Sequence, residues 1–186
     1  MHEEMPQPRD GMMSGFQLWV NLPARLKMTS PNYQEVPSRR IPEVLRENGV
    51  RIRIITGTVD GRQGPVTGIA ADPIYLDVWL PSETAFHQPV ERGHNGFAYV
   101  FEGEGLFGGA GGSGGVKVQS PRMVVFDDGD VVEVRTSTEA VRFLLVSGRP
   151  LHEPIARYGP FVMNTREEIE QTLRELREGT FVTARG

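Results

Sequence analysis

Residues 73–80 read PIYLDVWL, and this short stretch decides the class of fold. Large apolar side chains occupy every second position, at Ile74, Leu76, Val78 and Leu80. Successive side chains of a β-strand point to opposite faces, so these four share one face. The pattern therefore predicts a strand with one face buried in a protein core.

Similar stretches lie on both sides of this one, each bounded by turn residues. They read VRIRIITG (50–57), GFAYVFEGEG (96–105) and AVRFLLVSG (140–148), and residues 114–136 contain three further short strands with a turn at 127–130. The chain also has 22 glycines and 14 prolines. Many short strands separated by turn residues predict an all-β fold, either a barrel or a sandwich.

Residues 165–178 carry the one clear helical pattern. Thr165 and Glu168 have the spacing of a capping box, and Gly179 is typical of the position just after a helix. The apolar stripe along one side of this segment consists of Ile169, Leu173 and Leu176. We therefore expect one C-terminal helix beside the β-fold.

The N-terminal part of the chain is less regular. GFQLWVNLP (15–23) alternates as a strand does, and residues 24–49 are irregular apart from a helical turn predicted over 42–48. The apolar side chains on one face of the predicted strand are Phe16, Leu18, Val20 and Leu22. Their burial would contribute roughly 6–12 kcal/mol, which is comparable to the whole stability of a domain.

Composition excludes several classes of function. The chain has 186 residues, a net charge of −4 and no cysteine. The negative charge and the lack of a long basic run argue against nucleic acid or an anionic membrane as a partner. The missing cysteines exclude disulfides, thiol catalysis and Cys-based zinc sites. Since no apolar run approaches a membrane span or a signal peptide, we expect a soluble, cytoplasmic protein.

Two stretches match parts of binding motifs, but structural roles are favoured for both. Residues 109–114, GAGGSG, match G-x-G-x-x-G, yet the strand-like VKVQS follows where a nucleotide site needs a helix. We therefore expect a flexible hairpin loop. Asp127, Asp128 and Asp130 lack the loop length and terminal glutamate of an EF-hand, so a hairpin turn is expected there.

Three histidines outside the N-terminus are candidate metal ligands. His87 and His94 flank Glu91 in a stretch with Pro89 and Gly93. Such a stretch is typical of a loop, and surface or turn-stabilising roles are favoured for both histidines. His152 lies in a proline-rich connector, where a packing or hydrogen-bonding role is favoured.

The chain begins MHEEMP, in which His2 and Glu4 lie two residues apart. In a strand this spacing puts both side chains on one face, where an imidazole and a carboxylate can bind the same metal. Chain ends are the least ordered parts of most domains. On the local sequence alone, a chance match is therefore the favoured interpretation.

Several blocks together resemble the pirin family over nearly the whole chain. They read HEEMP, GFQLWVNLP, KMTSPNYQE, YLDVWL, GHNGFAYVFEGEG and the long run SGRPLHEPIARYGPFVMNTREEIEQTLRELREGTF. The resemblance implies a bicupin, in which two β-barrels face each other and a helical tail follows. It also implies iron in the first barrel, held by three histidines and one glutamate. Members are associated with quercetin 2,3-dioxygenase activity and, in animals, with transcriptional co-regulation.

By this resemblance, His2 and Glu4 match the last two iron ligands of the family. The first two lie upstream in a His-x-His segment that this chain lacks, so the resemblance implies a chain that begins partway through its first barrel. The expected division is residues 1–36 as a remnant of the N-terminal cupin barrel, 37–49 as a linker, 50–149 as the C-terminal cupin barrel, and 150–186 as a connector and helix.

The second barrel is not expected to hold a metal. Cupins usually carry His-x-His near the strand that here reads GHNGFAYVFEG, and this chain has His94, Asn95 and Gly96 at that place. Glycine therefore stands where the second histidine would be, and the strand after the turn at 127–130 has no histidine.

The expected function is thus an iron-dependent dioxygenase of the quercetin 2,3-dioxygenase type with a flavonol-like substrate. Iron sites generally use about three or four ligands, so we expect this chain alone to bind Fe²⁺ weakly or not at all. The alternative is a non-catalytic cupin binding module that contacts a protein partner, as a transcriptional co-regulator does. The apolar face within residues 1–36 predicts packing on the second barrel, self-association or poor order.

Overall fold

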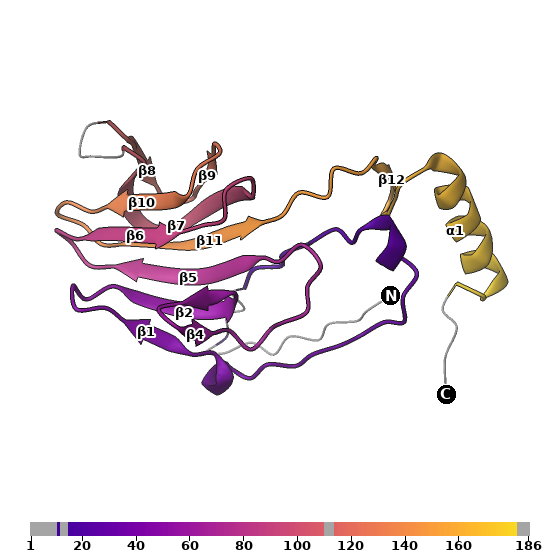
Figure 1. The fold of residues 1–186 in the computed structure, drawn as a ribbon, viewed down its shortest axis with the longest axis horizontal. Helices are drawn as coiled ribbons and strands as arrows, with labels where there is room; N and C mark the ends of the chain where they lie inside the picture. The colour runs from indigo at the N-terminus through magenta and orange to yellow at the C-terminus, as the bar shows by residue number, and fades with distance from the viewer. Residues whose placement is uncertain (1–10, 12–14, 110–113, 182–186) are drawn as a thin grey trace.

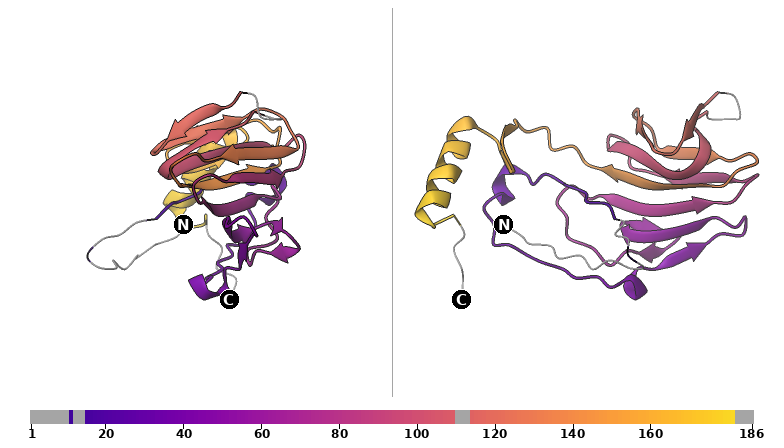
Figure 2. Two further views of the ribbon diagram at one scale, coloured as in Figure 1. Left: turned by 90° about the vertical axis from the view of Figure 1, so that its left-hand side faces the viewer. Right: turned by 180° about the vertical axis from the view of Figure 1, so that it is seen from behind.

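The structure is a computed structural model, and it describes residues 11, 15–109 and 114–181. Figure 1 shows a curled antiparallel sheet at one end of the molecule and the helix α1 (Arg166–Glu178) at the other. Extended segments from early and late parts of the chain run between the two ends. Figure 2 shows from behind that the helix stands well away from the sheet.

The prediction of an all-β fold with one C-terminal helix is confirmed. The strands of the curled sheet are β1 (Glu43–Leu45), β2 (Arg51–Thr56), β5 (Ile74–Leu80), β6 (Ala85–Pro89), β7 (Asn95–Phe107), β8 (Val116–Gln119), β9 (Arg122–Phe126), β10 (Val131–Arg135) and β11 (Val141–Gly148). Two small hairpins are β3 (Thr58–Val59) with β4 (Arg62–Gln63), and β12 (Ala156–Tyr158) with β13 (Phe161–Met163). Short 3₁₀ turns occupy Ala24–Leu26 and Ser38–Arg40.

The strand order is β1-β2-β5-β11-β7-β10-β6, with β8 and β9 also paired to β7. The long strand β7 curls the sheet, because its first part pairs with β9 and β11 and its second part with β8 and β10. Gly103 lies where these two parts meet and has a φ of 69°. A Cβ atom there would collide with the carbonyl oxygen of Ala140, so the bend requires glycine.

The curled sheet encloses one apolar core. Three of the four residues that the alternation predicts on the inward face of β5 are fully buried, namely Leu76, Val78 and Leu80, and Ile74 is partly buried against the core. Phe143 of β11 packs edge-on against Phe86 and Phe107, with ring centroids 5.8 and 5.2 Å apart. Edge-to-face packing is a favourable geometry for aromatic rings, so these three side chains tie β6, β7 and β11 together.

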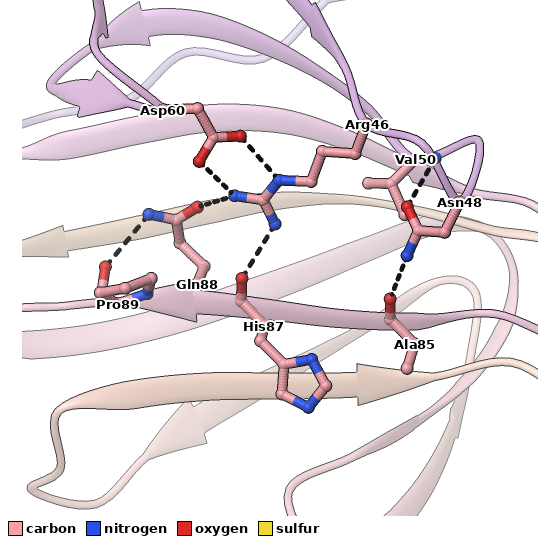
Figure 3. Close-up of polar contacts among 8 residues, drawn as sticks. All are labelled: Arg46, Asn48, Val50, Asp60, Ala85, His87, Gln88 and Pro89. Carbon is pink, nitrogen blue, oxygen red and sulfur yellow. Dashed lines mark hydrogen bonds and ion pairs between the residues drawn. The ribbon is translucent and has the colours of Figure 1, made fainter.

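Side chains close the barrel where its two edge strands meet. Strands β1 and β6 are the ends of the strand order and share no backbone ladder. Arg46, which follows β1, donates to the carbonyl oxygen of His87 at 2.9 Å, and Asn48 donates to that of Ala85 at 2.8 Å (Figure 3). Both carbonyls belong to β6, so these two side chains take the place of a strand pairing.

Arg46 has two further acceptors at this seam. Its guanidinium binds both carboxylate oxygens of Asp60, at 2.8 and 3.1 Å, and the Oε1 of Gln88 at 3.2 Å. Figure 3 shows the arginine between Asp60 on one side and the edge of β6 on the other. Bidentate arginine–carboxylate pairs fix direction as well as distance, so Asp60 holds the guanidinium against β6.

The helical turn predicted over 42–48 is wrong. This stretch contains the strand β1, which pairs with β2, and a turn that Gly49 closes with a φ of 84°. Proline is compatible with the start of an edge strand, so Pro42 did not distinguish a helix from a strand. The strand also lies within residues 37–49, for which the sequence predicts a linker, and it belongs to the sheet.

The strand predicted over 15–23 is also wrong. Residues 15–23 have an extended course but pair with no strand among the described residues, and most of their apolar side chains are exposed. A strand is held by hydrogen bonds to a neighbouring strand, and alternation of side chains cannot supply that neighbour.

The two turns predicted as hairpins have different outcomes. Strands β7 and β8 pair with each other on either side of the glycine-rich loop, so the hairpin around 109–114 is confirmed, although residues 110–113 lie outside the described part. The hairpin predicted at 127–130 is wrong. The turn connects β9 to β10, and these strands pair with β7 rather than with each other.

Helix α1 begins and ends as predicted. Thr165 and Glu168 form both hydrogen bonds of the capping box, and Gly179 adopts the left-handed conformation with a φ of 72°. Ile169 and Thr172 are the buried residues on its packed face, next to the β12–β13 hairpin. Among the residues described, this helix is too short and too polar to cross a bilayer.

Candidate functional site

The predicted metal ligands His2 and Glu4 lie outside the described residues. Whether they meet on one face therefore stays a prediction. Within residues 15–109 and 114–181, no group of three or more His, Cys, Asp or Glu side chains gathers as a metal site does. The described part of the chain thus offers no ready-made set of donors to complete the pair.

The other histidines fall at separate places. His87 on β6 is exposed, and its Nε2 lies 3.5 Å from the Oε1 of Glu133 on β10. His94 sits in the turn before β7, where its backbone N–H donates to the carbonyl of Glu91, and its Nδ1 is buried with no hydrogen-bond partner. The structure places His87 at the surface and His94 in a turn, as predicted, but the loop expected around His87 is wrong, because that residue lies on the strand β6.

His152 differs from its prediction. Its side chain is exposed, and its backbone has a φ of 52°, a conformation that non-glycine residues adopt rarely. The residue therefore shapes the connector through its backbone. The packing role predicted as one alternative for its side chain is wrong, and the other alternative, a hydrogen bond, has no partner among the described residues.

The segment that follows the predicted metal pair crosses the outer face of the barrel. Phe16 packs against Phe101 and Tyr99 of β7, with ring centroids 5.0 and 5.7 Å apart. Of the three outcomes expected for residues 1–36, packing on the second barrel is therefore partly realised through this one ring. Phe16 itself remains 50% exposed, so the contact is shallow.

Further along, Lys27 anchors the segment to the C-terminal hairpin. Its ammonium donates to the side-chain oxygen of Asn21 at 2.7 Å and to the carbonyl of Val162 at 2.9 Å. Burial lowers the pKa of Lys27, and the nearby carboxylates of Glu153 and Glu168 oppose this shift. The amine is therefore a structural clamp between residues that are 135 positions apart.

Glu153 makes a second tie at the same place. One of its carboxylate oxygens accepts from the backbone N–H of Ala24 at 2.7 Å and from the side chain of Asn164 at 3.0 Å. The segment before the barrel and the segment after it are thus held together by polar contacts. Sequence analysis missed Lys27 and Glu153, because no local pattern marks contacts over so long a separation.

An apolar groove lies between the two tied segments. Its volume is about 700 Å³. Its lining includes Trp19, Val20, Leu22, Met28, Ile155 and Phe161. Large exposed apolar patches on a soluble protein generally mark a binding surface, so this groove is the strongest candidate for an interface in the described structure.

Comparison with known proteins agrees with this geometry. The curled antiparallel sheet is that of a cupin-type β-barrel protein. The profile of the pirin C-terminal cupin domain matches residues 75–182. The chain belongs to the pirin family.

Individual relatives extend the match beyond that domain. A pirin-like protein of Caulobacter vibrioides is 42% identical over 187 residues, which cover 97% of this chain and 63% of the relative. A Thermoplasma acidophilum protein with the provisional name quercetin 2,3-dioxygenase is 33% identical, and the match covers 99% of this chain and 75% of that relative. The chain thus spans about 63% of the length of the Caulobacter relative.

A solved structure supports the same assignment. The crystal structure of a quercetin 2,3-dioxygenase from Acinetobacter baumannii superposes with a TM-score of 0.77 at 30% sequence identity. The match covers 88% of this chain and 55% of that one. The fold predicted from the sequence and its resemblance to pirins are therefore both confirmed.

Proposed function

We propose that this chain takes part in an iron-dependent dioxygenation of a flavonol-like substrate, with His2 and Glu4 as two of the iron ligands. The observation that carries the proposal is the match over nearly the whole chain to proteins that bear the quercetin 2,3-dioxygenase name. Residues 1–36 would be the remnant of a first barrel, and 50–149 a complete second one. Bound iron in such an enzyme supplies the chemistry with oxygen, and the protein orients the substrate.

His2 and Glu4, together with the described residues, do not make up the donor set of a complete iron centre. An imidazole and a carboxylate are suitable iron ligands, but a stable site generally needs about three or four. The described residues bring no further cluster of donors. We therefore derive no catalytic step for the chain alone, and the missing ligands would have to come from other polypeptide, as in the upstream part of the family.

Iron content measured by elemental analysis tests this proposal. After loading with Fe(II) and dialysis, the chain alone should retain far less than one iron per molecule. A chimera that adds the unmatched part of the Caulobacter relative should retain iron and consume quercetin, followed by its absorbance. In the chimera, His2→Ala and Glu4→Ala should abolish both, whereas Glu3→Ala should not; Glu3 is the matched control, because in a strand its side chain would point to the opposite face.

Two results would overturn the proposal. One is tight, near-stoichiometric iron in the chain alone that His2→Ala and Glu4→Ala do not remove, which would show that other residues hold it. The other is a chimera whose quercetin consumption is unchanged by His2→Ala and Glu4→Ala, which would remove these residues from the iron site.

A non-catalytic binding module is the second candidate, and the apolar groove favours it. Val20 and Met28 line the groove and are 43% and 59% exposed. Self-association through residues 1–36 would bury such side chains and stabilise the contact. If the occupant of the groove is a second copy of this chain, multi-angle light scattering should show oligomers that the double variant Val20→Ser, Met28→Ser converts to monomers. A monomer at all concentrations would contradict self-association through the groove.

A further inference from the structure

A small pocket opens at the end of the barrel where β7 begins and β11 ends. Three residues from neighbouring strands lie side by side there: Ser147 on β11 pairs with Gly96 on β7, which pairs with Phe126 on β9. The pocket has a volume of about 160 Å³ and shares no lining residue with the apolar groove. All the residues that line it lie between Val90 and Ser147, within the second barrel.

The floor and one wall of the pocket are apolar. Leu145 is fully buried, Val132 is nearly so, and the ring of Phe126 is packed against the core. Such a lining favours a ligand with an apolar body, because contact with it removes apolar surface from water.

Gly96 leaves space between its two neighbours in the sheet, Ser147 and Phe126. A Cβ atom built there would lie 3.4 Å from the Phe126 ring and 3.8 Å from the Cβ of Ser147, which are ordinary contacts. A side chain at this position would thus fit and would extend into the row between its neighbours. The space exists because residue 96 is a glycine and has no side chain to fill it.

Two polar side chains lie beside this apolar space. His94 lines the pocket, and its Nδ1 is buried without a hydrogen-bond partner. Ser147 lines it as well and is only 3% exposed. A buried polar atom without a partner costs about 1–3 kcal/mol, so a ligand group that bonds to it gains affinity.

The rim of the pocket is acidic. Asp127 and Asp128 line it, and Asp130 follows. Arg92 lies 3.8 Å from Asp128 and 2.8 Å from Asp130, so one cation pairs with two carboxylates while Asp127 adds a third. The remaining negative charge disfavours anionic ligands.

We propose that the mouth of the second barrel is a binding site for a small, uncharged aromatic alcohol of the phenol class. The volume matches one ring, since an engineered apolar cavity of about 150 Å³ in another protein holds benzene. The ring would lie against Phe126 and Leu145, and its hydroxyl would bond to His94 or Ser147. This site does not depend on the proposed iron chemistry.

Titration of the full chain with phenol, followed by ¹H–¹⁵N correlation spectra, tests the site. We expect saturable shifts that centre on the backbone amides of Gly96 and Ser147. Benzoate, the anionic analogue, should produce no saturable shift at these amides. Toluene, which has the ring without the hydroxyl, should bind more weakly than phenol.

Variants then separate the ring contact from the hydroxyl contact. Gly96→Ala should reduce phenol affinity several-fold, because the added methyl group would occupy part of the space that the ring needs. Ser147→Ala should weaken phenol by about threefold to tenfold but leave toluene unchanged. His87→Ala, at an exposed histidine on β6, is the control and should change neither.

The proposal fails if phenol shifts map outside this pocket, or if they do not saturate. It fails equally if benzoate binds as well as phenol, because the acidic rim would then have no effect. The comparison of phenol, benzoate and toluene uses the unaltered chain, so it tests the proposal even if a variant does not fold.

Discussion

Residues 73–80 and 15–23 have the same alternating sequence pattern and opposite structures. In β5, Leu76 is fully buried between two paired strands, whereas Leu18 in the N-terminal segment is 36% exposed and belongs to no strand. Both stretches have apolar residues at every second position. The difference shows that alternation indicates which face of a segment is apolar. Whether that face is buried depends on a neighbouring strand.

The first prediction tests this difference directly. Leu76→Ala removes side-chain atoms from the closed core and should lower the free energy of unfolding by about 2–5 kcal/mol. Leu18→Ala, its counterpart in the segment, should lower it by less than about 1 kcal/mol, because the side chain is already partly in water. Urea denaturation followed by circular dichroism measures both, and equal losses would contradict the comparison.

The second prediction concerns the bend that gives the barrel strands their partners. Gly103→Ala should lower the free energy of unfolding by about 1–3 kcal/mol or more, because its left-handed backbone and the Ala140 carbonyl both oppose a side chain. Gly129→Ala is the matched control, since nothing lies within 4 Å of a Cβ there. It should change stability by less than about 0.5 kcal/mol in the same urea experiment. A tolerated Gly103→Ala would mean that β7 bends elsewhere.

The third prediction concerns the seam, where side chains replace a strand partner. Arg46→Leu removes the donor of the His87 carbonyl and of Asp60 at the surface and should lower the free energy of unfolding by about 0.5–1.5 kcal/mol. Arg149→Leu, which breaks an exposed ion pair with Asp72, should lower it by less than about 1 kcal/mol. Hydrogen exchange should also speed up at β6 in the first variant only. Unchanged exchange there would show that the seam closes without Arg46.

The smallest effect is a pH dependence at the same seam. The hydrogen bond from Arg46 holds the pKa of the Asp60 carboxyl below its usual value. Such a group stabilises the fold above its unfolded pKa of about 3.9, and the contribution is lost as the pH falls through the folded-state pKa. The stability difference between wild type and Asp60→Asn should therefore be constant from about pH 7 to pH 5 and shrink toward pH 3.

Repeating the measurement in the Arg46→Leu variant tests the cause of that pH dependence. When both proteins also carry Arg46→Leu, the stability difference caused by Asp60→Asn should no longer change with pH, because the partner that shifts the pKa is gone. A dependence that persists would assign the effect to another group. Thermal melts in buffers of equal ionic strength are sufficient to measure it.

Much of the fold could be predicted from the sequence. The alternation in 73–80 and 140–148 and the capping box at Thr165 are local patterns, and each corresponds to the expected strand or helix. The predicted helical turn at 42–48 failed because Pro42 is equally suited to an edge strand. The hairpin predicted at 127–130 failed because a turn's residues do not tell which strands it connects.

The candidate sites depend more heavily on contacts between distant residues. Resemblance to pirins pointed to His2 and Glu4, which lie outside the described residues, so their role stays a prediction. Lys27 and Val162 meet across 135 positions, and no local pattern indicates this contact. The sequence did not predict the pocket at Gly96. It showed only that glycine stands where the resemblance to cupins leads one to expect a histidine.

The sequence by itself determined which side chains must leave water, because alternation and turn residues are properties of neighbouring positions. It therefore determined an all-β fold, its one helix and the likeness to pirins. Only the tertiary structure decided which apolar faces found a partner: β5 is enclosed by β2 and β11, and residues 15–23 are not. The physical reason is that burial and hydrogen bonding require atoms from distant parts of the chain. The topology of the fold decides which distant segments lie next to each other.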